Sequence, residues 1–65
     1  MMVATPLERE LTALQEQLPN ARLSKVLYLD THEIVVYFDN AHTITFPVRE
    51  WWSDACLARI ALECP

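Results

Sequence analysis

The chain has 65 residues and a formal net charge of −4 at pH 7, from nine acidic and five basic side chains. A chain of this length makes a single domain over residues 1–65. The acidic balance argues against nucleic-acid binding, which requires a cationic surface. No apolar stretch approaches the roughly 18 residues of a membrane span, and no basic region precedes an apolar run at the N-terminus. We therefore expect a cytoplasmic protein without nucleic-acid or membrane partners.

The apolar content is high for such a short chain, at 52% of the residues. A domain of this size buries only about 60% of the surface that its unfolded chain exposes, so a monomer is marginally stable. Apolar side chains that do not fit one small core are covered by self-association or by a partner. The composition therefore predicts a homo-oligomer, and a second protein is a further candidate partner.

Glycine is absent from the sequence. The glycine-rich phosphate loops of the two common nucleotide-binding motifs are therefore excluded. Every turn has to use other residues, and Asn20, Asp30 and Asn40 are the ones that best tolerate left-handed backbone.

An amphipathic helix is predicted near the N-terminus. Thr5 has the properties of a cap, Pro6 suits the first helical position, and Glu8 completes a capping box. The apolar stripe of this helix consists of Leu7, Leu11, Leu14 and Leu18. Such a stripe packs on a sheet or docks on a partner. Pro19 and Asn20 end the helix.

Three short strands follow, over residues 23–29, 33–38 and 42–48. They are rich in β-branched and aromatic residues and are separated by polar clusters, which is typical of an antiparallel meander. A second helix begins after Ser53 as its cap, with Trp52 and Leu57 at the spacing of a hydrophobic staple. The predicted fold is an α+β domain in the order αβββα, with both helices packed on one face of the sheet.

Alternation along the strands predicts two faces. We assign one set of side chains to the helix-covered core: Leu23, Leu27, Leu29, Ile34, Val36, Phe38, Ile44, Phe46 and Val48. The second face then keeps Val26, Tyr28, Val35 and Tyr37, which is too apolar for full exposure to water. These four residues are candidate interface residues. A shift of one residue in register would exchange the faces, and the lack of glycine leaves the turn type open.

Trp51 and Trp52 are adjacent, and we expect that both cannot face one core. Trp52 has the staple position. Trp51 then packs against its own strand or the first helix, or contacts a second chain, where tryptophan is enriched. Trp51 is therefore the fifth candidate interface residue.

No catalytic, cofactor or metal site is predicted. His32 and His42 fall in the two turns of the meander, which point to opposite ends of the sheet, so they do not converge on one ion. Cys56 and Cys64 are eight positions apart on one helix, about 12 Å, which is too far for a disulfide. We expect buried thiols in a reducing compartment.

The segment from Val36 to Trp52 carries a strand ending in Phe38-Asp39, a tight turn, a second strand, Pro47 and a tryptophan entering a helix. This pattern resembles the small bacterial domain of unknown function 2442, over roughly residues 23–63. Members usually carry Asp-Gly at the turn, where this chain has Asn40-Ala41. The resemblance implies a compact α+β module without a known activity, and some members are suspected toxin–antitoxin partners. It implies no functional residue.

The leading hypothesis is a small non-enzymatic interaction protein that forms a homodimer, with a regulatory or antitoxin-like role. One alternative is an acidic inhibitor from a phage or mobile element that occupies the nucleic-acid site of a host nuclease complex. A salt-sensitive interaction with a basic protein would favour it. The other alternative is a very small metal-dependent enzyme, in which replacing His32 or His42 would abolish activity.

Overall fold

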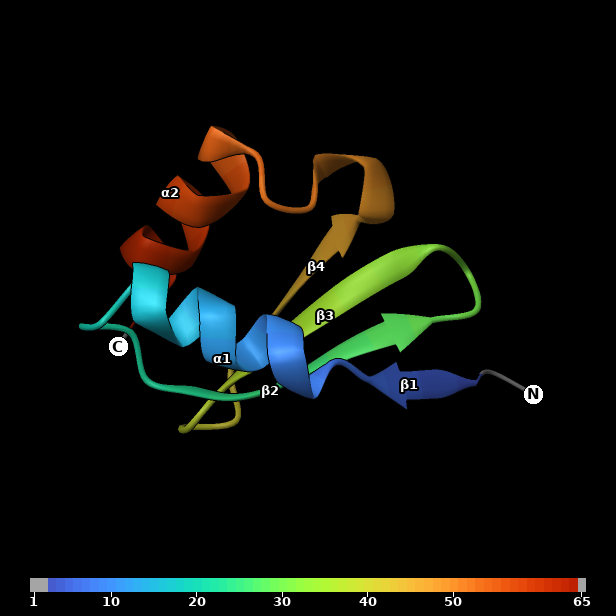
Figure 1. Cartoon of the computed structure of the whole chain (residues 1–65), viewed down its shortest axis with the longest axis horizontal. Coiled ribbons are helices and arrows are strands. Elements are labelled where there is room, and N and C mark those ends of the chain that lie inside the picture. Colours follow the sequence, from blue (N-terminus) through green and yellow to red (C-terminus); the bar gives the residue numbers. More distant parts are fainter. Residues whose placement is uncertain (1–2, 65) are drawn as a thin grey trace.

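The computed structural model describes residues 3–64 and has an α+β fold, with two helices and one antiparallel sheet in the strand order β1-β2-β3-β4 (Figure 1). The elements in chain order are β1 (Ala4–Pro6), α1 (Glu8–Gln17), β2 (Leu23–Leu29), β3 (Glu33–Phe38), β4 (Thr43–Pro47), the 3₁₀ turn η1 (Val48–Glu50) and α2 (Asp54–Glu63). The predicted α+β class is confirmed, and the predicted meander corresponds to β2, β3 and β4. The short strand β1 makes the sheet four-stranded instead of three-stranded.

Strand β1 replaces the helix start that the sequence predicted. Thr5 lies opposite Tyr28 in the antiparallel β1–β2 pair, so it is a strand residue and not a helix cap. Helix α1 begins at Glu8, and Leu7 precedes it without a capping side chain. The Leu7 N–H instead donates to the Val26 carbonyl at 2.9 Å. The predicted cap is wrong because the backbone before α1 finds its hydrogen bonds on β2.

The core lies between the sheet and the two helices, which both cover the same face of the sheet (Figure 1). We call this side the covered face. Its buried side chains are Leu14 from α1, Cys56 and Ile60 from α2, and Val26, Ile34, Val36, Phe38, Ile44 and Phe46 from the sheet. The other leucines of the α1 stripe are half-buried against this cluster, so the prediction that the stripe packs on the sheet is confirmed.

Helix α2 begins as the sequence predicted. Ser53 accepts a hydrogen bond from the Cys56 N–H at 3.1 Å, which satisfies one of the free donors of the first turn. Asp54 stands in that turn, where the helix dipole favours a negative charge. Trp52 and Leu57 both pack against the core, in agreement with their predicted staple positions.

The faces of β3 and β4 are as predicted, but the face assignment of β2 is wrong. The β2–β3 pairing shifts by one residue between Leu23 and Lys25, which marks an irregularity of the β-bulge kind. After it Val26 lies opposite Val36 and is only 1% exposed. One extra residue turns every later side chain of β2 to the other face. Tyr28 therefore follows Val26 onto the covered face.

Two smaller expectations also fail. Val48, expected in the core, is 40% exposed because β4 ends at Pro47 and Val48 begins η1. The left-handed backbone positions among residues 3–64 are His32, Ala41 and Trp52, and not the three Asn and Asp positions that the sequence favours. A left-handed conformation at a non-glycine residue costs about 1–2 kcal/mol, so the tight turns of this glycine-free chain carry some strain.

Candidate interaction surface

The sheet has a second face that neither helix covers, and we call it the open face. It is formed by residues that alternate with the buried ones and by their cross-strand neighbours. Its members are Ala4 and Pro6 in β1, Lys25, Leu27 and Leu29 in β2, Glu33, Val35 and Tyr37 in β3, and Thr43, Thr45 and Pro47 in β4. Figure 1 shows both helices on the opposite side of the sheet.

The centre of the open face is apolar. Leu27, Leu29, Val35 and Tyr37 are half-buried by their neighbours, although no other element of the described chain packs over them. An antiparallel sheet with one side in water normally carries polar residues on that side. Here polar character is confined to the rim, so this face has the composition of a surface that becomes covered.

Two charged side chains mark opposite ends of the open face. Lys25 places its Nζ 4.5 Å from the centre of the Tyr37 ring, an approach at which a cation is attracted to the ring. Glu33 is half-buried and accepts a hydrogen bond from the Thr31 hydroxyl at 2.9 Å. The other nine residues of the face are uncharged. Lys25 pairs with Tyr37 across the strands, and Glu33 pairs with Leu29 at the other end.

Of the candidate interface residues in the strands, the structure places Val35 and Tyr37 on the open face and Val26 and Tyr28 on the covered face. Val26 belongs to the core. Tyr28 is half-buried against the core, and its hydroxyl is hydrogen-bonded to His32 Nδ1 at 2.9 Å. Placing Val26 and Tyr28 on the second face is therefore wrong, because the register shift in β2 exchanges the two sets.

The same shift brings Leu27 and Leu29, which strict alternation assigns to the core, onto the open face. Both sit opposite β3 residues of this face, Leu27 opposite Val35 and Leu29 opposite Glu33. The run 26–29 is apolar at every position, so alternation carries no information there. The polar pair Ser24-Lys25 is the one local sign of an interrupted pattern.

Trp51 lies on the helix side of the sheet, away from the open face. Its ring centre is 6.4 Å from that of Phe46 and 5.9 Å from that of Trp52. Both tryptophans are half-buried against the core, so the expectation that they must diverge is wrong. Trp52 Nε1 donates to Glu10 Oε2 at 3.0 Å, whereas the buried indole N–H of Trp51 meets no acceptor within residues 3–64. A contact between Trp51 and a second chain stays a prediction.

The two histidines have separate structural partners. His32 contacts Tyr28 in the β2–β3 turn, as described above. His42 stacks on Phe38, with ring centres 5.7 Å apart, and its Nε2 lies 2.9 Å from Glu63 Oε1 on α2. The pKa of the Glu63 carboxyl lies below its ordinary value of 4.5. The main cause is the hydrogen bond with His42, and the hydrogen bond from Arg59 is the second cause. Within residues 3–64 no three His, Cys, Asp or Glu side chains are grouped to hold a metal ion.

Of the two thiols expected to be buried, Cys56 is buried, whereas Cys64 at the C-cap of α2 is only half-buried. Burial raises the pKa of the Cys56 thiol above its ordinary value of 9.0, which keeps it protonated at neutral pH. A protonated, buried thiol is a poor nucleophile. Cys64 Sγ donates to the Asn20 carbonyl at 3.4 Å, across the contact between the end of α2 and the loop after α1.

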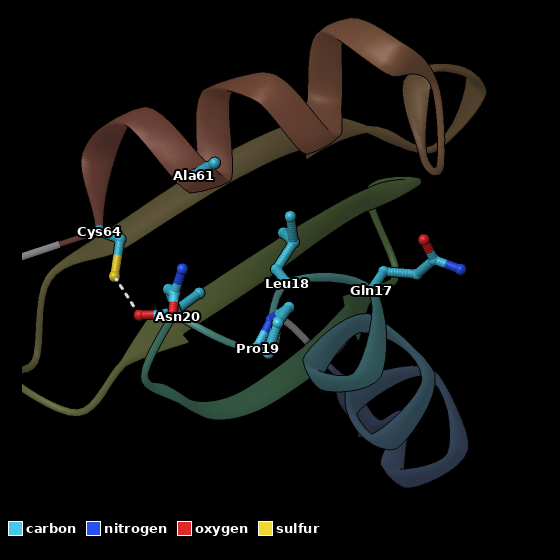
Figure 2. Close-up of a pocket in the computed structure, with 7 residues that line it drawn as sticks. Gln17, Leu18, Pro19, Asn20, Ala61 and Cys64 are labelled. Carbon is cyan, nitrogen blue, oxygen red and sulfur yellow. Dashed lines mark hydrogen bonds between the residues drawn. The ribbon is translucent and has the colours of Figure 1, made fainter.

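This contact borders a shallow cavity of about 390 Å³ (Figure 2). Its lining comes from the last residue of α1 and the loop that follows (residues 17–21) and from Ala61 and Cys64 at the end of α2, and it includes no charged side chain. Figure 2 shows the Cys64–Asn20 hydrogen bond at its edge. The Gln15 amide holds the loop, because it donates to the Leu18 and Ala21 carbonyls. We assign the cavity to the packing of α2 against this loop.

No protein-family model, curated protein or solved structure matches the chain. The resemblance to the domain of unknown function 2442 stays a prediction. Among the described residues, neither helix is both long and apolar enough to cross a membrane.

Proposed function

We propose that the protein is a small non-enzymatic protein-interaction module that forms a homodimer through the open face of its sheet. The observation that supports this proposal is the apolar centre of that face, formed by Leu27, Leu29, Val35 and Tyr37. These side chains occupy the positions that polar residues take in a solvated antiparallel sheet. A partner that covers them would add hydrophobic stabilisation in proportion to the apolar area removed from water.

The size of the chain supports the same proposal. The single core of residues 3–64 is built from nine buried side chains. A domain with so small a core gains stability from association, since binding between folded chains stabilises the folded state by mass action. Two sheets packed face to face about 10 Å apart would add a second core between the open faces.

The biological role within this proposal is regulatory or antitoxin-like, in the cytoplasm of a bacterial cell. That part of the proposal depends on the composition and on the resemblance described above. In such a role the dimer would present the helix side, which includes Leu62 at 84% exposure, to a second protein. The exposed helix surface and the open face therefore have different partners in this proposal.

Sedimentation equilibrium of the purified chain tests the proposal. We expect the average mass to rise from the monomer value of 7.5 kDa toward twice that value as the concentration increases. The Val35→Glu variant should stay monomeric, because a carboxylate at the centre of the apolar face would be desolvated in the dimer.

Leu62→Glu is the matched control for this experiment. It introduces the same carboxylate at an exposed leucine of α2, and it should leave the association unchanged. A wild-type chain that stays monomeric up to about 500 μM would contradict self-association, since even small interfaces of about 1,200 Å² support weak complexes. If Leu62→Glu abolishes association and Val35→Glu does not, the interface lies on α2 and not on the open face.

A further inference from the structure

The charges of the open face are arranged in a way that selects one orientation of a second copy. Cross-strand pairing divides the centre of the face into three rows. Lys25 and Tyr37 form the row at one end, Leu27 and Val35 form the middle row, and Leu29 forms the row at the other end with Glu33. Rows two residues apart along a strand are about 6.6 Å apart, so the two charged ends are separated by about 13 Å.

Two copies stacked face to face with their strands aligned, and related by a two-fold axis, can meet in two ways. If the axis runs along the strands, each end of the face meets the same end of the other copy. Lys25 then meets the partner's Lys25 and Glu33 meets the partner's Glu33, and both contacts are repulsive. If the axis runs across the strands over the middle row, the Lys25 end meets the partner's Glu33 end twice, and both contacts are attractive.

We propose that the occupant of the open face is a second copy of this chain, placed by a two-fold axis that crosses the strands above Leu27 and Val35. This inference rests on the proposed function. In this arrangement the apolar middle rows of the two copies pack on each other. The Lys25–Tyr37 pair of each copy then lies over the partner's Leu29 and the partner's Glu33. The Lys25 ammonium and the Tyr37 hydroxyl both suit the partner's Glu33 carboxylate as hydrogen-bond donors.

The size of the face explains why charge selects the orientation. The whole monomer exposes 4424 Å². A standard interface takes about 800 Å² from each partner, which would be almost a fifth of that surface. The three longer strands of the open face span roughly 20 Å by 15 Å in projection, or about 300 Å² per copy, which is well below that standard area. In a small apolar interface, two symmetric pairs of opposite charges are enough to favour one docking geometry over the other.

Charge reversal at the two ends tests the geometry. Lys25→Glu and Glu33→Lys should each weaken dimerisation by at least about tenfold, because each change turns both symmetric contacts repulsive. The double variant Lys25→Glu/Glu33→Lys should restore the wild-type dissociation constant within about threefold, and so should an equimolar mixture of the two single variants. The measurement is sedimentation equilibrium at low ionic strength, with circular dichroism to confirm folding of each variant.

Two control variants separate contact from net charge. Arg9→Glu has the same net charge as Lys25→Glu, −4 − 2 = −6, and Glu16→Lys has the same as Glu33→Lys, −4 + 2 = −2. Arg9 and Glu16 are exposed on α1, on the far side of the sheet, and their replacement should leave the dissociation constant within about twofold.

The outcomes are distinguishable. If neither Lys25→Glu nor Glu33→Lys changes the dissociation constant of the dimer, this geometry is wrong and the proposed homodimer still stands. The same holds if the double variant is as weak as the single ones while folded. A wild-type chain that never associates overturns both proposals. If either single variant fails to fold, the double variant and a titration of the wild type with salt decide, since the geometry requires weaker association as screening increases.

Discussion

The two faces of the sheet can be compared directly at Val35 and its two neighbours in β3. Ile34 and Val36 are 1% and 0% exposed beneath the helices, whereas Val35 between them stays half-buried on the open face. All three are β-branched and apolar, so the side-chain chemistry is the same on both sides. The difference arises from what lies above each face. The covered face is completed by α1 and α2 of the same chain, whereas neither helix lies over the open face.

In the proposed dimer, adjacent residues of one strand serve stability and association. Side chains on the covered face are packed from several elements, so their loss leaves a cavity. Side chains on the open face lose part of their contacts with water only when the partner binds. Substitutions in the two sets should therefore differ in kind: one set should change the free energy of unfolding, and the other should change the dimer dissociation constant.

The largest expected effect is on the covered face at the end of β3. Phe38→Ala should lower the free energy of unfolding by about 3–5 kcal/mol, because the buried ring is replaced by a cavity. Its neighbour Tyr37→Ala is the matched control on the open face, and it should cost less than about 1.5 kcal/mol in the monomer. Urea denaturation at a concentration that keeps the chain monomeric measures both values. Equal losses would show that the two faces are equally packed.

A smaller effect sharpens the comparison in β2. Val26→Ala should destabilise the monomer by about 2 kcal/mol, because Val26 is 1% exposed in the core. Leu27→Ala removes a larger part of a side chain but should cost under about 1 kcal/mol in the monomer, since Leu27 is on the open face. Strict alternation from Leu23 predicts the reverse order. Urea denaturation of both variants measures the two losses. A larger loss for Leu27→Ala than for Val26→Ala would mean that the register shift in β2 is absent.

The smallest effect concerns the end of the covered face, where α2 meets the β3–β4 hairpin. His42 and Arg59 hold the pKa of Glu63 below 4.5. A lowered pKa in the folded state contributes stability that is present above the unfolded value and is lost as the pH falls through the folded value. Glu63→Gln should therefore show a shallower loss of stability than the wild type between about pH 5.5 and pH 3. Parallel melting curves at each pH measure the difference, and identical slopes would mean that the pair does not form in solution.

The sequence predicted the parts of the fold whose patterns are unambiguous. In β4 the apolar residues alternate with threonines, so Ile44 was placed correctly. The cap at Ser53 has the required side chain before an apolar periodic segment, and α2 begins there. These features depend on local chemistry, which a single sequence contains.

The failures occur where tertiary pairing overrides the local signal. Thr5-Pro6 has the chemistry of a helix start, but pairing with β2 draws these residues into a strand, and α1 begins at Glu8. In β2 the apolar run 26–29 fits either face, and the register shift before Val26 decides between them. For this reason two of the four candidate interface residues in the strands, Val26 and Tyr28, were assigned to the wrong face. Both tryptophan rings pack against the core, contrary to the expectation that they diverge, and Trp52 has a positive φ of 69°.

An isotope-filtered NMR experiment on a mixture of labelled and unlabelled chains tests the central claim most directly. It detects contacts only between protons of different copies, at a concentration where the dimer is populated. The account predicts contacts from the Leu27 and Val35 methyl groups to the other copy, and none from Ile34 or Val36 beneath the helices. Intermolecular contacts from Leu62 on α2, with none from Leu27 and Val35, would contradict it.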